Sequence, residues 1–189
     1  MNQKVLKHQP HIIYTIGYST YSFTAFLLML QAFQIKTLID IRALPGSRKF
    51  PQYDKDDLAQ SLTQAGIQYV YLKSLGGRRK THKQSKNSRW KNTSFQAYAD
   101  YMETPAFEEG IKDLEQMAKE SLTVIMCAEA VWWRCHRSMI ADYLKAKGWE
   151  VRHIMHTNKA TEHPYTSSAR VVGDRVFYDY EDNECGYLF

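Results

Sequence analysis

The chain lacks the long apolar stretches that a signal peptide or a membrane span requires. Its N-terminus, MNQKVLKHQPHIIYTIG, contains no continuous apolar run. The most apolar segment, Phe23 to Phe33, is far shorter than the about 20 residues of a spanning helix. Cysteine is also scarce: Cys127, Cys135 and Cys185 are an odd number, which favours reduced thiols over a disulfide framework. We therefore expect a cytoplasmic protein without membrane contact.

Several signature motifs of nucleotide-binding proteins and hydrolases are missing as well. The sequence has no G-x-x-x-x-G-K-[ST] and no G-x-G-x-x-G, so the Walker and Rossmann phosphate loops are absent. The absence of G-x-S-x-G weakens the case for a serine hydrolase. No helix-turn-helix, zinc finger or other nucleic-acid reader is recognisable. The function must therefore be inferred from groups of residues.

Short apolar runs that are rich in β-branched or aromatic residues predict five strands, and helical patterns lie between them. The expected strands are Ile12–Ile16, Thr37–Ile41, Ile67–Leu72, Leu122–Met126 and Val151–Met155. The expected helices are Phe23–Gln34, Asp54–Ala65, Phe95–Glu103, Pro105–Lys119 and Arg134–Lys147.

Such alternation predicts a three-layer, doubly wound α/β fold with a mainly parallel sheet of about five strands. Val171–Tyr178, broken at Gly173–Asp174, adds a C-terminal hairpin or edge strand. The length suits a single domain over residues 1–189. The segment Phe23–Phe33 is apolar on nearly every side, so we expect it to be buried in the fold or in a subunit contact, which allows a homodimer.

Residues that directly follow the strands are the candidate site residues, because ligands of open α/β sheets bind outside the carboxyl ends of the strands. We expect Ser19, Arg42, Glu129, His136 and Arg137 to converge on one cleft. Two of them also have structural alternatives: Ser19 as a helix cap, and Arg42 as the ion-pair partner of Asp40. The expected ligand-binding residues are Ser19, Arg42, Arg48, Arg134 and Arg137.

The candidate catalytic residues are Glu129, His136, Cys127 and Cys135. Glu129 is expected to be a general acid or base, with His136 as its partner. A helix that begins near Arg134 would stabilise a thiolate at Cys135, whereas burial would raise the pKa of Cys127. Either thiol is a candidate nucleophile, and both also fit the role of small buried residues.

Two specific chemistries fit the spacing poorly. The interval from Cys127 to Arg134 is one residue longer than in Cys-dependent phosphatases. Cys-(x)7-Cys-His matches no closed zinc site, and the neighbours Cys135 and His136 should point in different directions on a helix. We therefore predict no metal and no cofactor, with zinc, including His153 and His163 as further ligand types, kept as a minority alternative.

The charge of +5 is concentrated in one segment, Lys73 to Lys91, which contains eight basic residues and no acidic one. Residues 76–94 lack periodicity and predict a long basic loop. This loop is either a solvated surface or a contact for phosphates and a stacked base. The candidate nucleic-acid contacts are Arg78, Arg79, Lys80, Arg89, Trp90 and Lys91.

An ordered set of short motifs extends over residues 13–172. They are TIGYS (Thr15–Ser19), DIR (Asp40–Arg42), PGSR (Pro45–Arg48), LGGRR (Leu75–Arg79), W-x-N with FQAYADYM (Trp90–Met102), CAE (Cys127–Glu129), CHR (Cys135–Arg137), HI (His153–Ile154) and HPYT (His163–Thr166). Through them the chain resembles the prokaryotic family called domain of unknown function 488. The resemblance implies the fold and the candidate residues, and it implies no particular reaction.

These observations favour an enzyme, a hydrolase or a transferase, that handles a phosphate-bearing ligand such as a nucleotide or a nucleic acid. Arg42, Arg134 and Arg137 would hold the phosphate. The alternative is a non-catalytic accessory protein that binds single-stranded nucleic acid through the segment 73–91.

Overall fold

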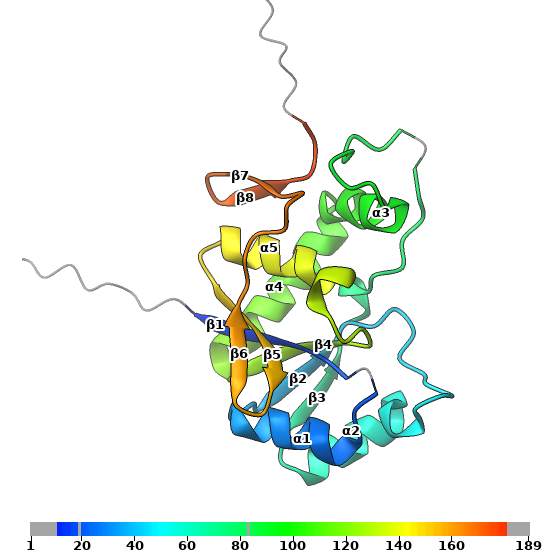
Figure 1. Cartoon of the computed structure of the whole chain (residues 1–189), viewed down its shortest axis with the longest axis vertical. Coiled ribbons are helices and arrows are strands. Elements are labelled where there is room, and N and C mark those ends of the chain that lie inside the picture. Colours follow the sequence, from blue (N-terminus) through cyan, green and yellow to red (C-terminus); the bar gives the residue numbers. More distant parts are fainter. Residues whose placement is uncertain (1–10, 19, 83, 181–189) are drawn as a thin grey trace, which may run out of the picture.

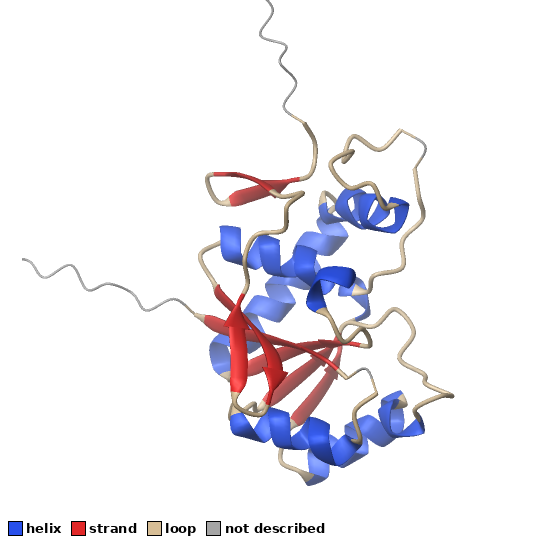
Figure 2. Ribbon diagram, viewed as in Figure 1, coloured by secondary structure: helices blue, strands red, loops and turns tan. Residues whose placement is uncertain are grey.

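The computed structural model describes residues 11–18, 20–82 and 84–180. A six-stranded sheet lies between two layers of helices, and a separate two-stranded hairpin packs beside one layer (Figures 1 and 2). This arrangement confirms the predicted three-layer α/β fold with a mainly parallel sheet and a C-terminal hairpin.

The sheet has the strand order β3-β2-β4-β1-β5-β6. The first five strands in sequence are parallel, whereas β6 runs antiparallel to β5. The sequence did not indicate β6, because its segment Lys-Ala-Thr-Glu is polar and forms an edge. The strands are β1 (Ile12–Gly17), β2 (Thr37–Asp40), β3 (Gln68–Tyr71), β4 (Thr123–Cys127), β5 (Glu150–His156) and β6 (Lys159–Glu162), with β7 (Arg170–Val172) and β8 (Arg175–Phe177) in the hairpin.

The helices α1 to α4 begin at capping side chains that the local sequence supplies, whereas α5 has no side-chain cap. Asn92 accepts a hydrogen bond from the backbone N–H of Ser94, and Thr104 caps the helix that begins at Pro105. The α-helices are α1 (Phe23–Ala32), α2 (Lys55–Gln64), α3 (Thr93–Met102), α4 (Pro105–Glu120) and α5 (Arg137–Ala146), and the 3₁₀ turns are η1 (Pro51–Tyr53), η2 (Lys73–Leu75) and η3 (Trp132–Arg134).

Right-handed crossovers explain which face of the sheet each helix covers. The connections from β1 to β2 and from β2 to β3 run toward the β3 edge, so α1 and α2 share one face. The connections from β3 to β4 and from β4 to β5 run the other way, so α4 and α5 cover the opposite face (Figure 1). The direction therefore reverses between the neighbouring strands β2 and β4, which is where open α/β sheets bind ligands.

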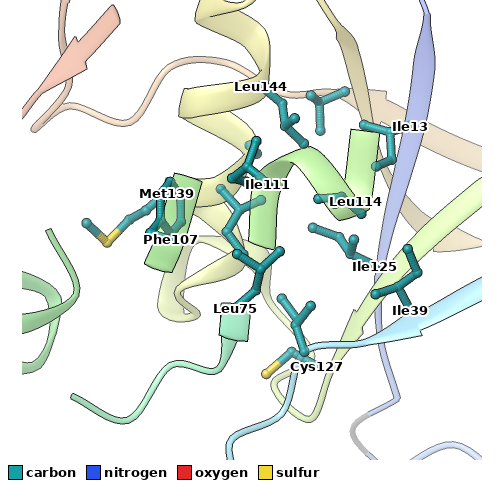
Figure 3. Packing of buried hydrophobic residues seen from close by; sticks show 14 of the residues in the cluster. Ile13, Ile39, Leu75, Phe107, Ile111, Leu114, Ile125, Cys127, Met139 and Leu144 are labelled. Carbon is teal, nitrogen blue, oxygen red and sulfur yellow. The ribbon is translucent and has the colours of Figure 1, made fainter. Parts of the chain in front are cut away.

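The core consists of two apolar clusters, one on each face of the sheet. One cluster joins Ile39 and Ile125 of the sheet to α4 and α5, and Figure 3 shows Cys127 at its margin. The other joins Leu38 and Met126 to α1 and α2. Leu28 of α1 is 53% exposed, so the fold itself does not bury this helix on every side, and the subunit contact stays a prediction. No helix within the described residues is both long and apolar enough to cross a membrane.

Candidate functional site

A pocket of about 420 Å³ lies at the carboxyl ends of β1, β2 and β4. Residues that follow each of these strands line it, together with the end of the η2 turn and the start of α3. Its position is the reversal point between β2 and β4, as the strand order requires. The lining residues are Tyr18, Arg42, Ala43, Leu44, Gly77, Arg78, Asn92, Ser94, Phe95, Cys127, Ala128, Glu129, Arg134, Cys135 and His136.

The pocket brings together many of the candidate residues, but not all of them. Its walls include Arg42, Arg134 and the four candidate catalytic residues, Cys127, Glu129, Cys135 and His136. Arg48 is exposed and does not contribute to the walls. Ser19 lies outside the described residues. The roles of all these residues in binding and catalysis stay predictions.

Arg42 forms the structural ion pair that was one of its two interpretations, and it lines the pocket as well. Its Nη2 lies 2.6 Å from Oδ2 of Asp40, and its Nη1 donates to the carbonyl of Tyr53 at 2.8 Å. Tyr69 donates its hydroxyl to the same Asp40 oxygen at 2.7 Å. Both ions are buried, so these contacts compensate the cost of removing two charges from water. The guanidinium is therefore held rigidly in the pocket wall.

Arg137, a predicted phosphate ligand, does not line the pocket, and backbone carbonyls occupy its terminal nitrogens. Nη1 donates to the carbonyls of Glu129 at 2.6 Å and Ile16 at 3.2 Å, and Nη2 donates to Ala130 at 2.8 Å. The side chain is 2% exposed and does not line the pocket. Arg137 thus ties the end of β1 to the loop that carries Glu129.

The helix after β4 begins later than predicted, and this changes the geometry of the thiols. The η3 turn covers Trp132–Arg134, Cys135 is extended with φ −131° and ψ 143°, and α5 begins at Arg137. Cys135 is therefore not in the first turn of a helix. In this conformation its Sγ lies 3.6 Å from Nδ1 of His136, and the two neighbouring side chains face the same point.

The pKa shifts of the two thiols run in the directions opposite to those expected from the sequence. A hydrogen bond from Cys135 lowers the pKa of the Cys127 thiol well below its ordinary value; burial opposes this, and His136 and Arg137 add to the lowering. Burial raises the pKa of the Cys135 thiol well above its ordinary value, and neighbouring Cys127 raises it further. The contact between the two thiols could not be seen in the sequence, and which of them reacts faster stays a prediction.

The long basic segment folds back onto the domain, and this engages three of its six candidate contacts. Arg79 lies over the ring of Tyr101 at 3.4 Å, and Arg89 donates to the carbonyl of Ser168 at 2.9 Å. The ring of Trp90 stacks on Phe95 with 4.5 Å between centroids, so a packing partner covers one of its faces. Arg78, Lys80 and Lys91 are exposed, and Arg78 also lines the pocket.

His153 and His163, which were considered as metal ligands, belong to a separate buried hydrogen-bond chain. Thr15 Oγ1 lies 2.7 Å from Nδ1 of His153, whose Nε2 lies 2.9 Å from Nδ1 of His163. Nε2 of His163 lies 3.0 Å from Asp142, which also accepts from the hydroxyl of Tyr178. Since a carboxylate only accepts, one proton on each Nε2 satisfies the whole chain with both imidazoles neutral. This chain links β1, β5, α5 and the end of the hairpin.

Eight of the pocket-lining residues were not among the candidate site residues, and Tyr18, Asn92 and Phe95 are the largest of the polar and aromatic ones. Tyr18 directly follows β1, so the rule that located Arg42 could also have found it. Asn92 and Phe95 lie at the start of α3, and no local signal indicates that this helix reaches the carboxyl edge of the sheet.

Fold and site together define a three-layer α/β protein with an arginine- and thiol-lined pocket at the reversal point of its sheet. A family model described as domain of unknown function DUF488 matches residues 22–144, and the chain belongs to this family. The match includes every pocket-lining residue except Tyr18. Neither the comparison with curated proteins nor that with solved structures finds a significant match.

Proposed function

We propose that this protein is an enzyme that binds a phosphate-bearing ligand, a nucleotide or part of a nucleic acid, in the pocket beside β2 and β4. The observation that carries the proposal is that Arg78 and Arg134, from two different loops, line one cavity that holds a single carboxylate, Glu129, whereas Arg42 in the same wall is already paired with Asp40. Guanidinium groups in excess of carboxylates favour an anion, and their planar donors match phosphate oxygens.

Glu129 is the proposed general acid or base, with His136 as its partner in proton transfer. Arg137 holds the backbone of Glu129 and Ala130. It thereby fixes the loop that carries the carboxylate without itself contacting the ligand. Such a fixed loop is what an acid–base group needs, since proton transfer requires hydrogen-bond distance to the reacting atom.

Binding is best tested by calorimetry on chelator-treated protein, with inorganic phosphate and the nucleoside monophosphates as probes. Arg78→Gln and Arg134→Gln should each weaken binding about tenfold or more, because a charge-assisted hydrogen bond contributes about 1.5–3 kcal/mol. Arg48→Gln is the matched control, since Arg48 is exposed outside the pocket. Equal affinity in all four proteins would contradict the proposal.

The enzymatic part has its own test, which also separates it from an accessory role. Glu129→Gln should leave phosphate binding intact and slow turnover of a panel of phosphomonoesters and phosphodiesters by about 10²–10⁴-fold. Binding that weakens steeply with salt and is accompanied by no turnover in the wild type would favour the non-catalytic alternative. One observation favours this second candidate: the exposed Arg78 and Lys80 continue the basic surface from the pocket rim.

A further inference from the structure

We propose that Cys127, Cys135 and His136 form a binding site for a zinc-class divalent ion in the wall of the pocket. The two sulfurs and one nitrogen of His136 all lie within 4.8 Å of one another. Both cysteines are free thiols and are buried, with 8% and 3% of their surfaces exposed. Among the described residues they form a group of three ligand atoms around one point.

The distance between Cys135 and His136 matches an edge of a metal tetrahedron. Ligand bonds of about 2.3 Å to sulfur and about 2.0–2.1 Å to nitrogen place the two ligand atoms about 3.6 Å apart at the tetrahedral angle. The separation between Cys135 Sγ and His136 Nδ1 is 3.6 Å. An imidazole nitrogen and two sulfurs are ligands that suit zinc, whereas magnesium and calcium prefer oxygen.

The local backbone makes this geometry available. On a helix, neighbouring side chains would diverge by about 100°, which is the reason that the sequence argued against zinc. Instead, Cys135 is extended and His136 caps α5 without using its side chain for the cap. Gly77 allows the ring to lie close, since a Cβ at this position would be 2.4 Å from Nδ1 of His136. The imidazole is thus held beside the sulfurs.

A cation would compensate the charge that the loss of the thiol protons creates at this point. Metal binding displaces the protons of both thiols, and two adjacent thiolates would repel each other without a positive charge between them. The nearby guanidinium of Arg137 already donates to three carbonyls. A divalent ion would neutralise the pair directly.

The site would have an open coordination position. Three protein ligands are typical of catalytic zinc, whereas structural zinc is held by four. Since all three residues line the pocket that Glu129 and the arginines also line, a fourth ligand could reach the ion from the pocket. A water molecule or a phosphate oxygen would be that ligand, and this last step alone rests on the proposed function.

The decisive experiment uses the full-length protein after removal of metal by a chelator. Addition of Co²⁺ should give thiolate-to-cobalt charge-transfer absorption and the intense visible bands of a tetrahedral ion, saturating at one equivalent. Zn²⁺ should then abolish this spectrum. In parallel, Zn²⁺ should protect Cys127 and Cys135, but not Cys185, from iodoacetamide, as resolved by peptide mass spectrometry. Cys185 lies outside the described residues.

Variants provide the residue assignment. Three variants should each weaken metal binding: Cys127→Ser, Cys135→Ser and His136→Gln. Loss of a residue that only supports a metal ligand typically lowers metal affinity by about 10- to 100-fold, so loss of a ligand should lower it at least as much. The control Cys185→Ser should leave metal affinity unchanged. If the variants do not fold, the protection of wild-type thiols still decides. An absence of charge-transfer absorption, or equal labelling with and without Zn²⁺, would overturn the metal site. Anion binding is measured without metal, so its failure is a separate result.

Discussion

Gly17 lies at the edge of the pocket in a position that has no room for a side chain. It ends β1 beside Cys127 of β4, and the carbonyl of Glu129 occupies the space that a Cβ would need. The same carbonyl accepts a hydrogen bond from Arg137. Three segments therefore meet at one backbone position. Glycine is needed here because it lets the backbones approach closely, and not because of an unusual φ angle.

Gly17→Ala should destabilise the protein by about 1–3 kcal/mol, the usual effect of overpacking, because the added Cβ would lie 1.8 Å from the backbone oxygen of Glu129. Gly46→Ala is the control, since its Cβ would be 3.6 Å from the nearest atom. It should change the free energy of unfolding by less than about 0.5 kcal/mol. Urea denaturation measures both, and coinciding midpoints would contradict the close approach.

At the scale of elements, local pattern located the five parallel strands and the five α-helices, with errors of a few residues at their ends. Its failures have non-local causes. The late start of α5 accompanies the anchoring of Arg137 to the carbonyl of Ile16 on β1, far away in sequence. The strand β6 was missed because only its pairing with β5 defines it. Contacts of this kind leave no periodic signal.

The buried chain from Thr15 to Asp142 makes stability depend on pH. Burial lowers the pKa of His153 to about 2, because a second proton would place a charge away from water, and the electrostatic effects of His163 and Arg137 contribute. Below about pH 6.5 His153 is protonated in the unfolded chain but stays neutral in the folded protein. The free energy of unfolding therefore decreases by about 1.4 kcal/mol for each unit by which the pH is lowered. Between pH 7 and pH 5, this residue should account for a loss of about 2 kcal/mol.

Urea denaturation at both pH values tests this expectation. His153→Gln removes the titrating group, so the difference between pH 7 and pH 5 should shrink by about 2 kcal/mol even if the variant is less stable overall. His156→Gln is the matched control, because His156 ends the same strand and is exposed. An unchanged pH dependence in His153→Gln would show that His153 does not carry the effect.

At the scale of the whole molecule, the rule that ligands bind outside the carboxyl ends of parallel strands predicts the edge on which the pocket lies, so residues after β2 and β4 could be named from the sequence. The strand order, and with it the reversal point, could not. The path of the basic segment could not be predicted either. Its return to the domain rests on Arg89 at the carbonyl of Ser168 and on Trp90 between Phe95 and Tyr178. These partners come from the C-terminal part of the chain and from α3. Arg89 and Trp90, two of the predicted nucleic-acid contacts, therefore contact other parts of the domain.

The exposed remainder of that surface should still bind polyanions. Arg78, Lys80 and Lys91 are exposed, so replacing all three with Ala should reduce affinity for a single-stranded oligonucleotide at low salt. If each cation contacts one phosphate, the log–log salt slope should decrease by about 2–3, since each lost contact removes about 0.7–0.9. Fluorescence anisotropy over a salt series measures the slope.

The control for this experiment carries the same change in charge at a distance from the segment. Lys36, Lys112 and Lys119 are exposed, the first before β2 and the others on α4. Replacing them with Ala removes three cations, so an effect of net charge alone would lower the slope equally in both variants. A contact surface would lower it only in the variant of the basic segment, because released counterions come from phosphates that the protein touches. If the wild type fails to bind at low salt, the segment is a solvated surface and the nucleic-acid alternative is wrong.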